Sequence, residues 1–253
     1  RDFCLSRGLG DVYKRQWNSW TEETLDWLID ASDTKPTNVA LDIATGAGFT
    51  ACALAGRVAH VTATDVSTGM LEQAKLRAEQ GGIKNITFLE APAEKLPLPD
   101  SSFDIVCCRI AAHHFLNVEA FLAESARLLK PGGRFLLVDT TVPDDNPHVG
   151  EWQNETEALR DRSHVRNRSA AEWRSNVKSA GLTVTQCTTS GNGITILLTD
   201  WLRKSGTNEP TATQVRERFY TAPDDVRAAF KIGKTEGDVT FTWMRILLKA
   251  VKP

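Results

Sequence analysis

Short apolar segments alternate with helical segments over residues 38–140, and this alternation limits the fold more than any other feature of the chain. Five segments read as strands: NVALDIA, RVAHVTATD, NITFLEA, FDIVCCRIA and RFLLVDT. Each is a nearly continuous apolar run, which indicates a strand buried on both faces. Such strands with helices between them predict an α/β fold whose parallel sheet is covered by helices on both sides.

The chain after the fifth strand is more polar. Its helical patterns predict cover helices over about 147–180 and 191–237, with an alternating strand, LTVTQCTTS, between them. The last segment, DVTFTWMRILLKAVK, predicts a single closing strand over about 238–251. We therefore expect one domain over 17–253, with its core at 38–140.

The first sixteen residues, RDFCLSRGLGDVYKRQ, show neither hydrophobic periodicity nor helix or strand signals. They resemble the in-frame translation of a sequencing-library adapter. We therefore expect residues 1–16 to be a non-native, adapter-derived segment and the natural N-terminal residues to be missing. Without this segment, 26 basic and 30 acidic residues remain, a formal charge of −4.

Composition argues against several classes of partner. The formal net charge of −2 gives no basic surface for nucleic acid, and no apolar run is long enough to span a bilayer. The five cysteines form no C-x-x-C, and Cys107 and Cys108 are adjacent on an expected buried strand. Buried thiols in a reducing compartment are therefore favoured over disulfides or a metal site. We expect a cytoplasmic protein with no metal, no nucleic-acid partner and no membrane insertion.

Right-handed crossovers bring the carboxyl ends of parallel strands to one edge of the sheet, where such sheets bind ligands. Several residues lie at or directly after these strand ends: Asp42, Asp65, Pro92, Ala93, Arg109 and Asp139. The pattern predicts a ligand site at this edge, whatever the family.

The first strand ends at Asp42 and leads into a turn that holds Gly46 and Gly48. The glycines let the backbone approach a ligand closely, but the last glycine of the dinucleotide motif G-x-G-x-x-G is absent. A carboxylate at the strand end repels phosphate and suits a cationic amino group. A tight turn that binds no ligand is the alternative interpretation of the glycine pair.

Asp65 follows the second strand, where an acid can accept hydrogen bonds from both hydroxyls of an unphosphorylated ribose. A helix N-cap is the alternative role. Combined with Asp42 and the glycine turn, the ligand role is favoured. Met70 lies one turn into the next helix and packs either on an adenine or in the core.

Four segments together carry a resemblance to a known family: LDIATGAG, TATDVSTGMLEQA, PAEKLPLPDSSFDIV and LLKPGGRFLLVD. They resemble class I S-adenosylmethionine-dependent methyltransferases, specifically the ubiquinone/menaquinone-type small-molecule branch with a methyltransferase type 11 domain. The resemblance covers Val39 to Asp139 and extends more loosely to Pro253. It implies a Rossmann-like, seven-stranded, mostly parallel sheet with a helical cover, S-adenosyl-L-methionine as cofactor, and a small-molecule substrate.

The resemblance also implies which residues hold the cofactor. The turn after Asp42 would hold its methionine part, Asp65 its ribose hydroxyls, and Ala93 its adenine ring through the backbone N–H. The implied cofactor-binding residues are Asp42, Ala44, Gly46, Gly48, Asp65, Val66, Met70, Ala93, Glu94 and Arg109.

Two positions depart from the family pattern. Ala44 stands where the family usually has glycine, a change of one carbon that is tolerated if the backbone angles there are ordinary. Pro92 stands where many relatives have an aspartate that binds the adenine amino group. Adenine recognition must then depend on backbone groups and packing.

Catalytic residues are expected just after the fourth strand. His114 is the candidate base, because a histidine can accept a proton near neutral pH, and Arg109 lies at the methionine end of the expected site. The alternative is that one histidine, His113, packs against or caps the next helix. Other candidates for acceptor binding belong to the cover region, where a solvated surface or a core role is the alternative: His148, His164, Arg162, Arg166, Trp152, Trp173 and Trp201.

Two functions from other classes remain open at this point. A non-catalytic S-adenosylmethionine-binding protein of the same fold is favoured by Pro92 and by the expected loss of the N-terminal residues. An NAD(P)-dependent oxidoreductase shares the sheet topology, and the missing third glycine of the turn argues against it.

Overall fold

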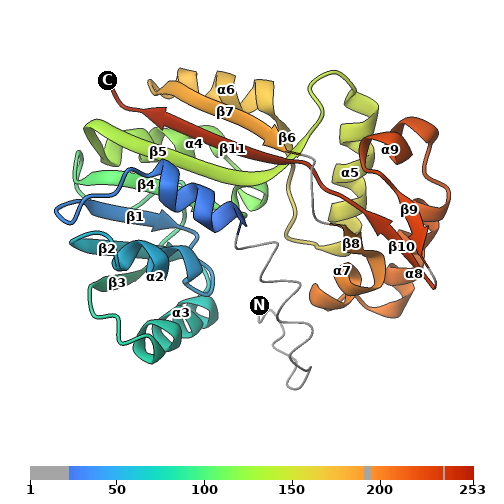
Figure 1. Ribbon diagram of the computed structural model, residues 1–253, viewed down its shortest axis with the longest axis horizontal. Coiled ribbons are helices and arrows are strands. Elements are labelled where there is room, and N and C mark those ends of the chain that lie inside the picture. Colours follow the sequence, from blue (N-terminus) through green and yellow to red (C-terminus); the bar gives the residue numbers. More distant parts are fainter. Residues whose placement is uncertain (1–22, 191–194, 236) are drawn as a thin grey trace.

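The computed structural model describes residues 23–190, 195–235 and 237–253, so the segment expected to be adapter-derived lies outside the described residues. Seven strands of the main sheet lie side by side in the order β3–β2–β1–β4–β5–β11–β7, as the resemblance implied (Figure 1). The first five are parallel, and β11 is antiparallel to both of its neighbours. Their bounds are β1 Val39–Ile43, β2 His60–Asp65, β3 Ile86–Glu90, β4 Phe103–Arg109, β5 Leu129–Val142, β7 Thr183–Ser190 and β11 Arg245–Val251.

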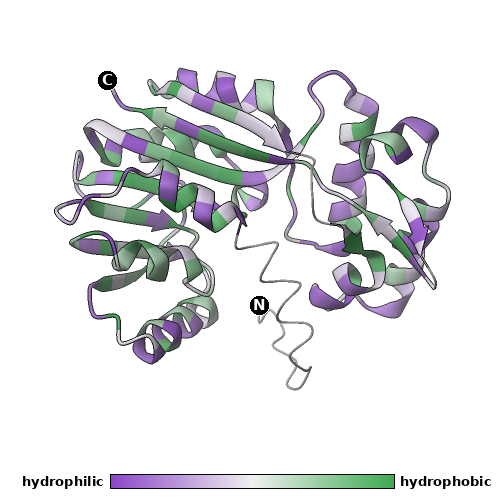
Figure 2. Ribbon diagram, viewed as in Figure 1, coloured by the Kyte–Doolittle hydropathy of each residue, from purple (hydrophilic) through white to green (hydrophobic). Residues whose placement is uncertain are grey.

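Alternate residues of the central strands pack into two apolar layers, because successive side chains of a strand point to opposite faces. Ala40 and Ile105 face one layer with a helix over residues 23–31 and α2, whereas Leu41 and Val106 face the other with α4 and α6. Figure 2 shows these strands as the most hydrophobic part of the molecule. The helices of this part are α2 Phe49–Ala55, α3 Thr68–Gln80, α4 Val118–Leu128 and α6 Ala170–Ser179.

A second apolar core lies beside the carboxyl edge of the sheet (Figure 1). It is built around rings of Trp152, Trp201, Phe219, Phe241 and Trp243, several of them in edge-to-face contact. We call this part the cover. Its elements are α5 Pro147–Arg160, α7 Leu198–Lys204, α8 Glu209–Tyr220, α9 Asp224–Ala229, and a small sheet of β8 Ile196–Leu197, β9 Gly233–Thr235 and β10 Asp238–Phe241.

The expected cover helices over about 147–180 are only partly correct. Helix α5 belongs to the cover, but α6 packs on the main sheet, with Trp173 and Val177 fully enclosed in that core. The cause is the apolar spacing of four residues between these side chains, which gives α6 one continuous face for the sheet. A two-stranded pairing of β6 Arg168–Ser169 with β5 leads into α6, and Ser169 and Glu172 form the capping box typical of a helix start.

The expected single closing strand over about 238–251 is also wrong in detail. Residues 238–241 form β10 in the cover, whereas residues 245–251 form β11 in the main sheet. Trp243, between the two strands, is buried in the cover core. Buried apolar side chains alternate at Val239, Phe241 and Trp243 and then at Ile246, Leu248 and Ala250, so the alternation shifts by one residue at Met244 and Arg245. This shift marks the place where the pairing partner changes, and the expectation of a single strand overlooked it. The segment of about 191–237 holds the three short helices expected there, together with β8 and β9.

Candidate functional site

The turn from β1 to α2 is fixed by hydrogen bonds from both sides. The hydroxyl of Thr45 donates to Asp42 at 2.6 Å, and the backbone N–H of Gly46 donates to Asp65 Oδ2 at 2.9 Å. Asp65 Oδ1 accepts the N–H of Ser67 at 2.9 Å, so this carboxylate links the glycine turn to the start of α3. Gly48 has a φ of +81°, and a Cβ there would lie 2.8 Å from the Cβ of Ala74 on α3.

Alanine at position 44 was expected to be tolerated if the backbone angles there were ordinary, and they are not. The φ of Ala44 is +54°, in the left-handed region that favours glycine. An L-residue with a Cβ in this region costs about 1–2 kcal/mol. Ile110, just after β4, also has a positive φ of 56°, which is rarer still for a β-branched residue. Ala44 and Ile110 both line the cavities described below, so the strained backbone lies at the candidate site.

Asp42 is buried beneath the turn. Burial raises its pKa to about 6, against the hydrogen bonds from Thr45 and Cys107 and the charge of Arg109, which lower it. Arg109 is largely buried as well. Burial lowers the pKa of the guanidinium, the charge of Asp42 raises it, and Nε donates to the hydroxyl of Thr50 at 2.9 Å.

Two adjoining cavities lie over the carboxyl edge of the sheet. The larger, of about 570 Å³, is lined by Asp65, Val66, Ala93 and Glu94 among others, and the smaller, of about 350 Å³, extends from the turn to the cover. Five residues line both cavities, so the two adjoin along a common wall: Ala44, Gly46, Met70, Ile110 and His114. Arg109 lines the smaller cavity. Asp42 and Gly48 line neither cavity. They shape the turn instead, Asp42 through its hydrogen bond with Thr45 and Gly48 through its close approach to Ala74.

His113 was considered from the sequence as the histidine that packs against or caps the following helix, the alternative to a catalytic role. Asn117 caps that helix, α4, and His113 contacts Asp139 of β5. Nδ1 lies 2.6 Å from Oδ1, and the backbone N–H donates to Oδ2 at 2.9 Å. Burial lowers the pKa of His113, but the charge and hydrogen bond of Asp139 outweigh it, so the pKa is raised overall.

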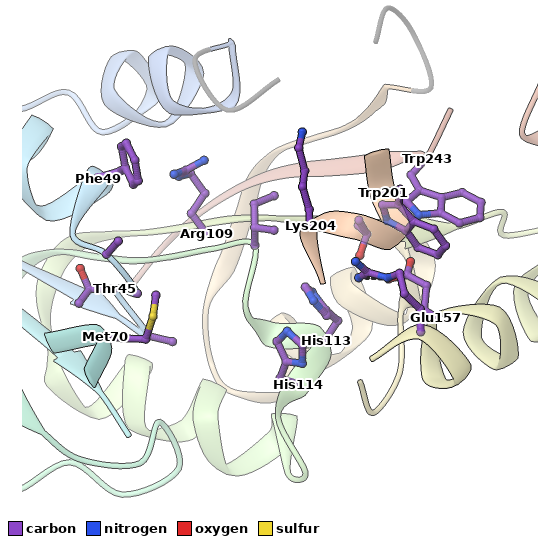
Figure 3. Close-up of a pocket in the computed structure, with 16 residues that line it drawn as sticks. Thr45, Phe49, Met70, Arg109, His113, His114, Glu157, Trp201, Lys204 and Trp243 are labelled. Atoms are coloured by element: carbon purple, nitrogen blue, oxygen red, sulfur yellow. Dashed lines mark ion pairs between the residues drawn. The ribbon is translucent and has the colours of Figure 1, made fainter. Parts of the chain in front are cut away.

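His114 also lines the site, with its ring centroid 4.0 Å from that of His113. Its Nδ1 lies 3.0 Å from the carbonyl oxygen of Ser163. Burial and the neighbouring His113 both lower the pKa of His114. Figure 3 shows the two histidines side by side in the wall of the smaller cavity, between the glycine turn and the cover.

The cover closes the far end of the smaller cavity with aromatic and charged side chains. Trp201, Trp243, Glu157, Arg160 and Lys204 line it there (Figure 3). The Arg160 guanidinium lies over the Trp201 ring, 4.2 Å from its centroid. Sequence reasoning named Trp201 as a candidate for this role but missed the three charged residues, whose spacing carries no recognisable motif.

The other candidates in the polar region do not line these two cavities. His148 pairs with Asp225 at the surface, Arg166 pairs with Glu172, and Trp173 is enclosed in the main core. His164 is buried, and burial lowers its pKa to about 4. Within the described residues, no three His, Cys, Asp or Glu side chains gather in a way that could hold a metal ion. No helix in the same part of the chain is both long and apolar enough to cross a membrane.

Comparison with known proteins identifies the family. The profile described as "Methyltransferase domain" matches residues 41–137. The chain is 36% identical to the Bacillus subtilis methyltransferase YcgJ over 232 residues, which cover 91% of this chain and 90% of YcgJ. It is 38% identical over 124 residues to the ubiquinone/menaquinone biosynthesis C-methyltransferase UbiE of Brucella canis, covering 47% and 45% of the two chains.

Solved structures agree with this relationship. The crystal structure of Bacillus subtilis YcgJ superposes with a TM-score of 0.85 at 34% identity, over 91% of this chain and 98% of that one. A geranyl diphosphate C-methyltransferase from Streptomyces coelicolor, solved with S-adenosyl-L-homocysteine, shares the fold with a TM-score of 0.72 at 14% identity, over 98% and 86%. The chain therefore belongs to the class I S-adenosylmethionine-dependent methyltransferases.

Proposed function

We propose that the larger cavity holds the adenosine part of S-adenosylmethionine, and that the smaller cavity holds its methionine part and a small-molecule methyl acceptor. The observation that carries this proposal is that the two cavities share the wall made by the glycine turn and His114, with Asp65 lining the larger cavity and His113 lining the smaller one. UbiE and the geranyl diphosphate enzyme are named for small-molecule acceptors, which supports the same class here.

The residues of the larger cavity suit an adenosine. Each carboxylate oxygen of Asp65 accepts one backbone N–H, which leaves lone pairs for two ribose hydroxyls. A Cβ on Gly46 would lie 3.4 Å from Met70, so a larger residue in the turn would narrow the cavity. The remaining lining is mostly apolar, including Val66 and Ala93, and suits a purine ring held by packing.

When bound, the cofactor supplies an electrophilic methyl group on a sulfonium. The protein must then align the acceptor and, for an acceptor that carries a proton, remove it. Asp139 accepts from Nδ1 of His113, so Nε2 of that ring is the basic nitrogen that can take the proton. His114 lies beside it and contributes to the cavity wall. This assignment changes the catalytic candidate from His114 to His113, with Asp139 as a positioning residue.

The surroundings of this site favour a small acceptor in the cytoplasm over nucleic acid. The net charge of −2 lacks the basic surface that phosphate backbones require, and the cover forms one wall of the cavity. The cysteines in the described part of the chain, Cys52, Cys107, Cys108 and Cys187, are free thiols, which supports a reducing compartment.

Calorimetric titration with S-adenosylhomocysteine tests the cofactor site. Asp65→Ala should weaken binding at least tenfold, because the ribose hydroxyls lose their acceptor. Glu72→Ala, an exposed carboxylate on α3, is the matched control and should leave the affinity unchanged. Equal affinity of the Asp65→Ala variant and the original protein would contradict the proposal.

A further inference from the structure

The cover wall of the smaller cavity combines cationic groups with indole rings. Arg160 is the last residue of α5 and Lys204 is the last residue of α7, and both line the cavity beside Trp201 and Trp243. Arg109 lines the same cavity at its sheet end, where its guanidinium donates to the hydroxyls of Thr50 and Thr24. Glu157 is the only acidic side chain that lines this cavity among the described residues.

Two buried donors on this wall have no hydrogen-bond partner within the described chain: Nε of Arg160 and Nε1 of Trp243. A buried donor without a partner is costly, so native structures nearly always supply an acceptor atom. Glu157 Oε2 lies 3.8 Å from Nη2 of Arg160, which is beyond hydrogen-bond distance.

Glu157 is not dedicated to Arg160. Its Oε1 accepts hydrogen bonds from Gln153 at 3.2 Å and from Asn167 at 3.0 Å, and its Oε2 lies 3.9 Å from Nδ1 of His164. Lys204 adds a second positive group, whose pKa is lowered by burial and by Arg203 but raised by Asp200. The wall therefore holds two donors, Nε of Arg160 and Nε1 of Trp243, that Glu157 does not satisfy.

We propose that the methyl acceptor is a small anionic molecule, a carboxylate or a phosphate ester, with a planar apolar body. Arg160 and Lys204 bind its anionic group, and the rings of Trp201 and Trp243 contact its body. A guanidinium suits both anions, since its fork of donors matches two oxygens of a carboxylate or phosphate. This inference rests on the proposed function, because it places the acceptor at the cover end of the smaller cavity.

Calorimetry on the full chain saturated with S-adenosylhomocysteine tests the inference. The probes are 1-naphthoate, 1-naphthyl phosphate and the uncharged 1-naphthamide, which share a planar body. At least one anion should bind tenfold or more tightly than the amide, and comparing the two anions identifies the preferred acid. Binding of the amide as tight as both anions, or binding of none of the three, would overturn the inference.

Arg160→Met keeps the apolar contact with Trp201 and removes the charge. It should weaken binding of the preferred anion at least tenfold and leave S-adenosylhomocysteine affinity within twofold. Arg174→Met, on the exposed side of α6, is the control and should change neither. An unchanged affinity for the anion would overturn the inference. An equal loss of affinity for the anion and for S-adenosylhomocysteine would also overturn it, because Arg160 would then belong to the cofactor site.

Lys204→Gln is the second variant and decides the outcome if Arg160→Met fails to fold, as judged by its thermal unfolding. It should weaken binding of the preferred anion at least threefold. Lys178→Gln on α6 is its control and should leave this binding unchanged. Failure of the proposed function gives a different result, because S-adenosylhomocysteine would then bind independently of Asp65 or not at all.

Discussion

Asp139 holds His113 at two points, with Oδ2 on the backbone N–H at 2.9 Å and Oδ1 at 2.6 Å from Nδ1. The next residue, His114, faces the carbonyl oxygen of Ser163 instead. Two adjacent rings, 4.0 Å apart, therefore differ in their electrostatic surroundings. The negative charge of Asp139 stabilises the imidazolium of His113, whereas burial and His113 itself disfavour that of His114.

Histidine titration by NMR should separate the two rings. The pKa of His113 should lie above 6.5 and that of His114 below it. Asp139→Asn should bring the pKa of His113 below 6.5, because the burial that lowers it remains when the charge is removed. Asp144→Asn, which alters a surface partner of Arg174, should leave both rings unchanged. Equal pKa values for the two rings would contradict the assignment of Asp139 as the partner of His113.

The rate of methyl transfer should fall on the acid side as His113 becomes protonated. Only the neutral ring can accept a proton, so kcat should decline as the pH falls through a pKa above 6.5. Asp139→Asn should lower kcat by about 10–100-fold with KM little changed, and should move this acid limb to lower pH. The measurement is the initial rate of S-adenosylhomocysteine formation between pH 5.5 and 9, with an acceptor that the enzyme methylates. An acid limb at the same pH in both proteins would exclude His113 as the base.

The sequence predicted the parallel sheet because its five strands are nearly continuous apolar runs. Strands β1, β2 and β4 are buried over most of their length, whereas the edge strand β3 is only partly buried. The sequence also placed Asp42, Asp65, Arg109 and Asp139 at one edge, since chain direction alone determines where parallel strands end. It could not predict the pairing of Asp139 with His113, because a loop conformation brings these residues together across 26 positions.

The cover shows a second limit. Within residues 238–251, Val239, Phe241 and Trp243 face the cover core, whereas Ile246, Leu248 and Ala250 face the main core. A shift of one residue in the alternation is a weak signal, so it did not reveal from the sequence that the chain passes from the small sheet to the main sheet. Arg160 and Lys204 reach the cavity from the ends of separate helices, and neither helix carries a motif. Charged residues at helix ends are common, so their meeting around one cavity is a property of the tertiary structure.

Asp42 should make stability depend on pH. Its folded pKa of about 6 exceeds the ordinary value of 3.8, so its protonation stabilises the folded state below pH 3.8, and this contribution is lost as the pH rises through 6. At pH 8 the charged carboxylate lowers the unfolding free energy by up to about 3 kcal/mol, because each unit of pKa difference between the folded and unfolded states corresponds to about 1.4 kcal/mol. Asp42→Asn should therefore be more stable than the original protein at pH 8, by about 1–2 kcal/mol after the loss of one hydrogen bond.

Urea unfolding at pH 4 and pH 8 measures this difference. The advantage of Asp42→Asn should shrink or reverse at pH 4, where both side chains are uncharged. Asp30→Asn, an exposed residue, is the control and should show no comparable change between the two pH values. The compared quantity is the unfolding free energy of Asp42→Asn minus that of the original protein. A smaller value of this difference at pH 8 than at pH 4 would contradict the raised pKa.

Gly48→Ala should destabilise the protein strongly. The new Cβ would lie 2.8 Å from the Cβ and 3.0 Å from the Cα of Ala74, and the φ of +81° disfavours any side chain. The backbone of α3 cannot move away without disturbing its packing, so we expect a loss of at least about 2 kcal/mol in unfolding free energy. Gly82→Ala also has a positive φ but open space around it, and should lose less. Equal losses would show that the contact with Ala74 is unimportant.

Ala44→Gly should stabilise the protein, although glycine usually destabilises a folded chain. Relief of the positive φ gains about 1–2 kcal/mol, against an entropic cost of about 0.5–1 kcal/mol for glycine, so the net gain should be about 0.5–1 kcal/mol. Ala47→Gly is the matched control three residues later in the same turn. Its φ is not positive, so only the entropic cost applies and stability should fall. Urea unfolding of the two variants should therefore give shifts of opposite sign, and a loss in both would show that Ala44 is not strained.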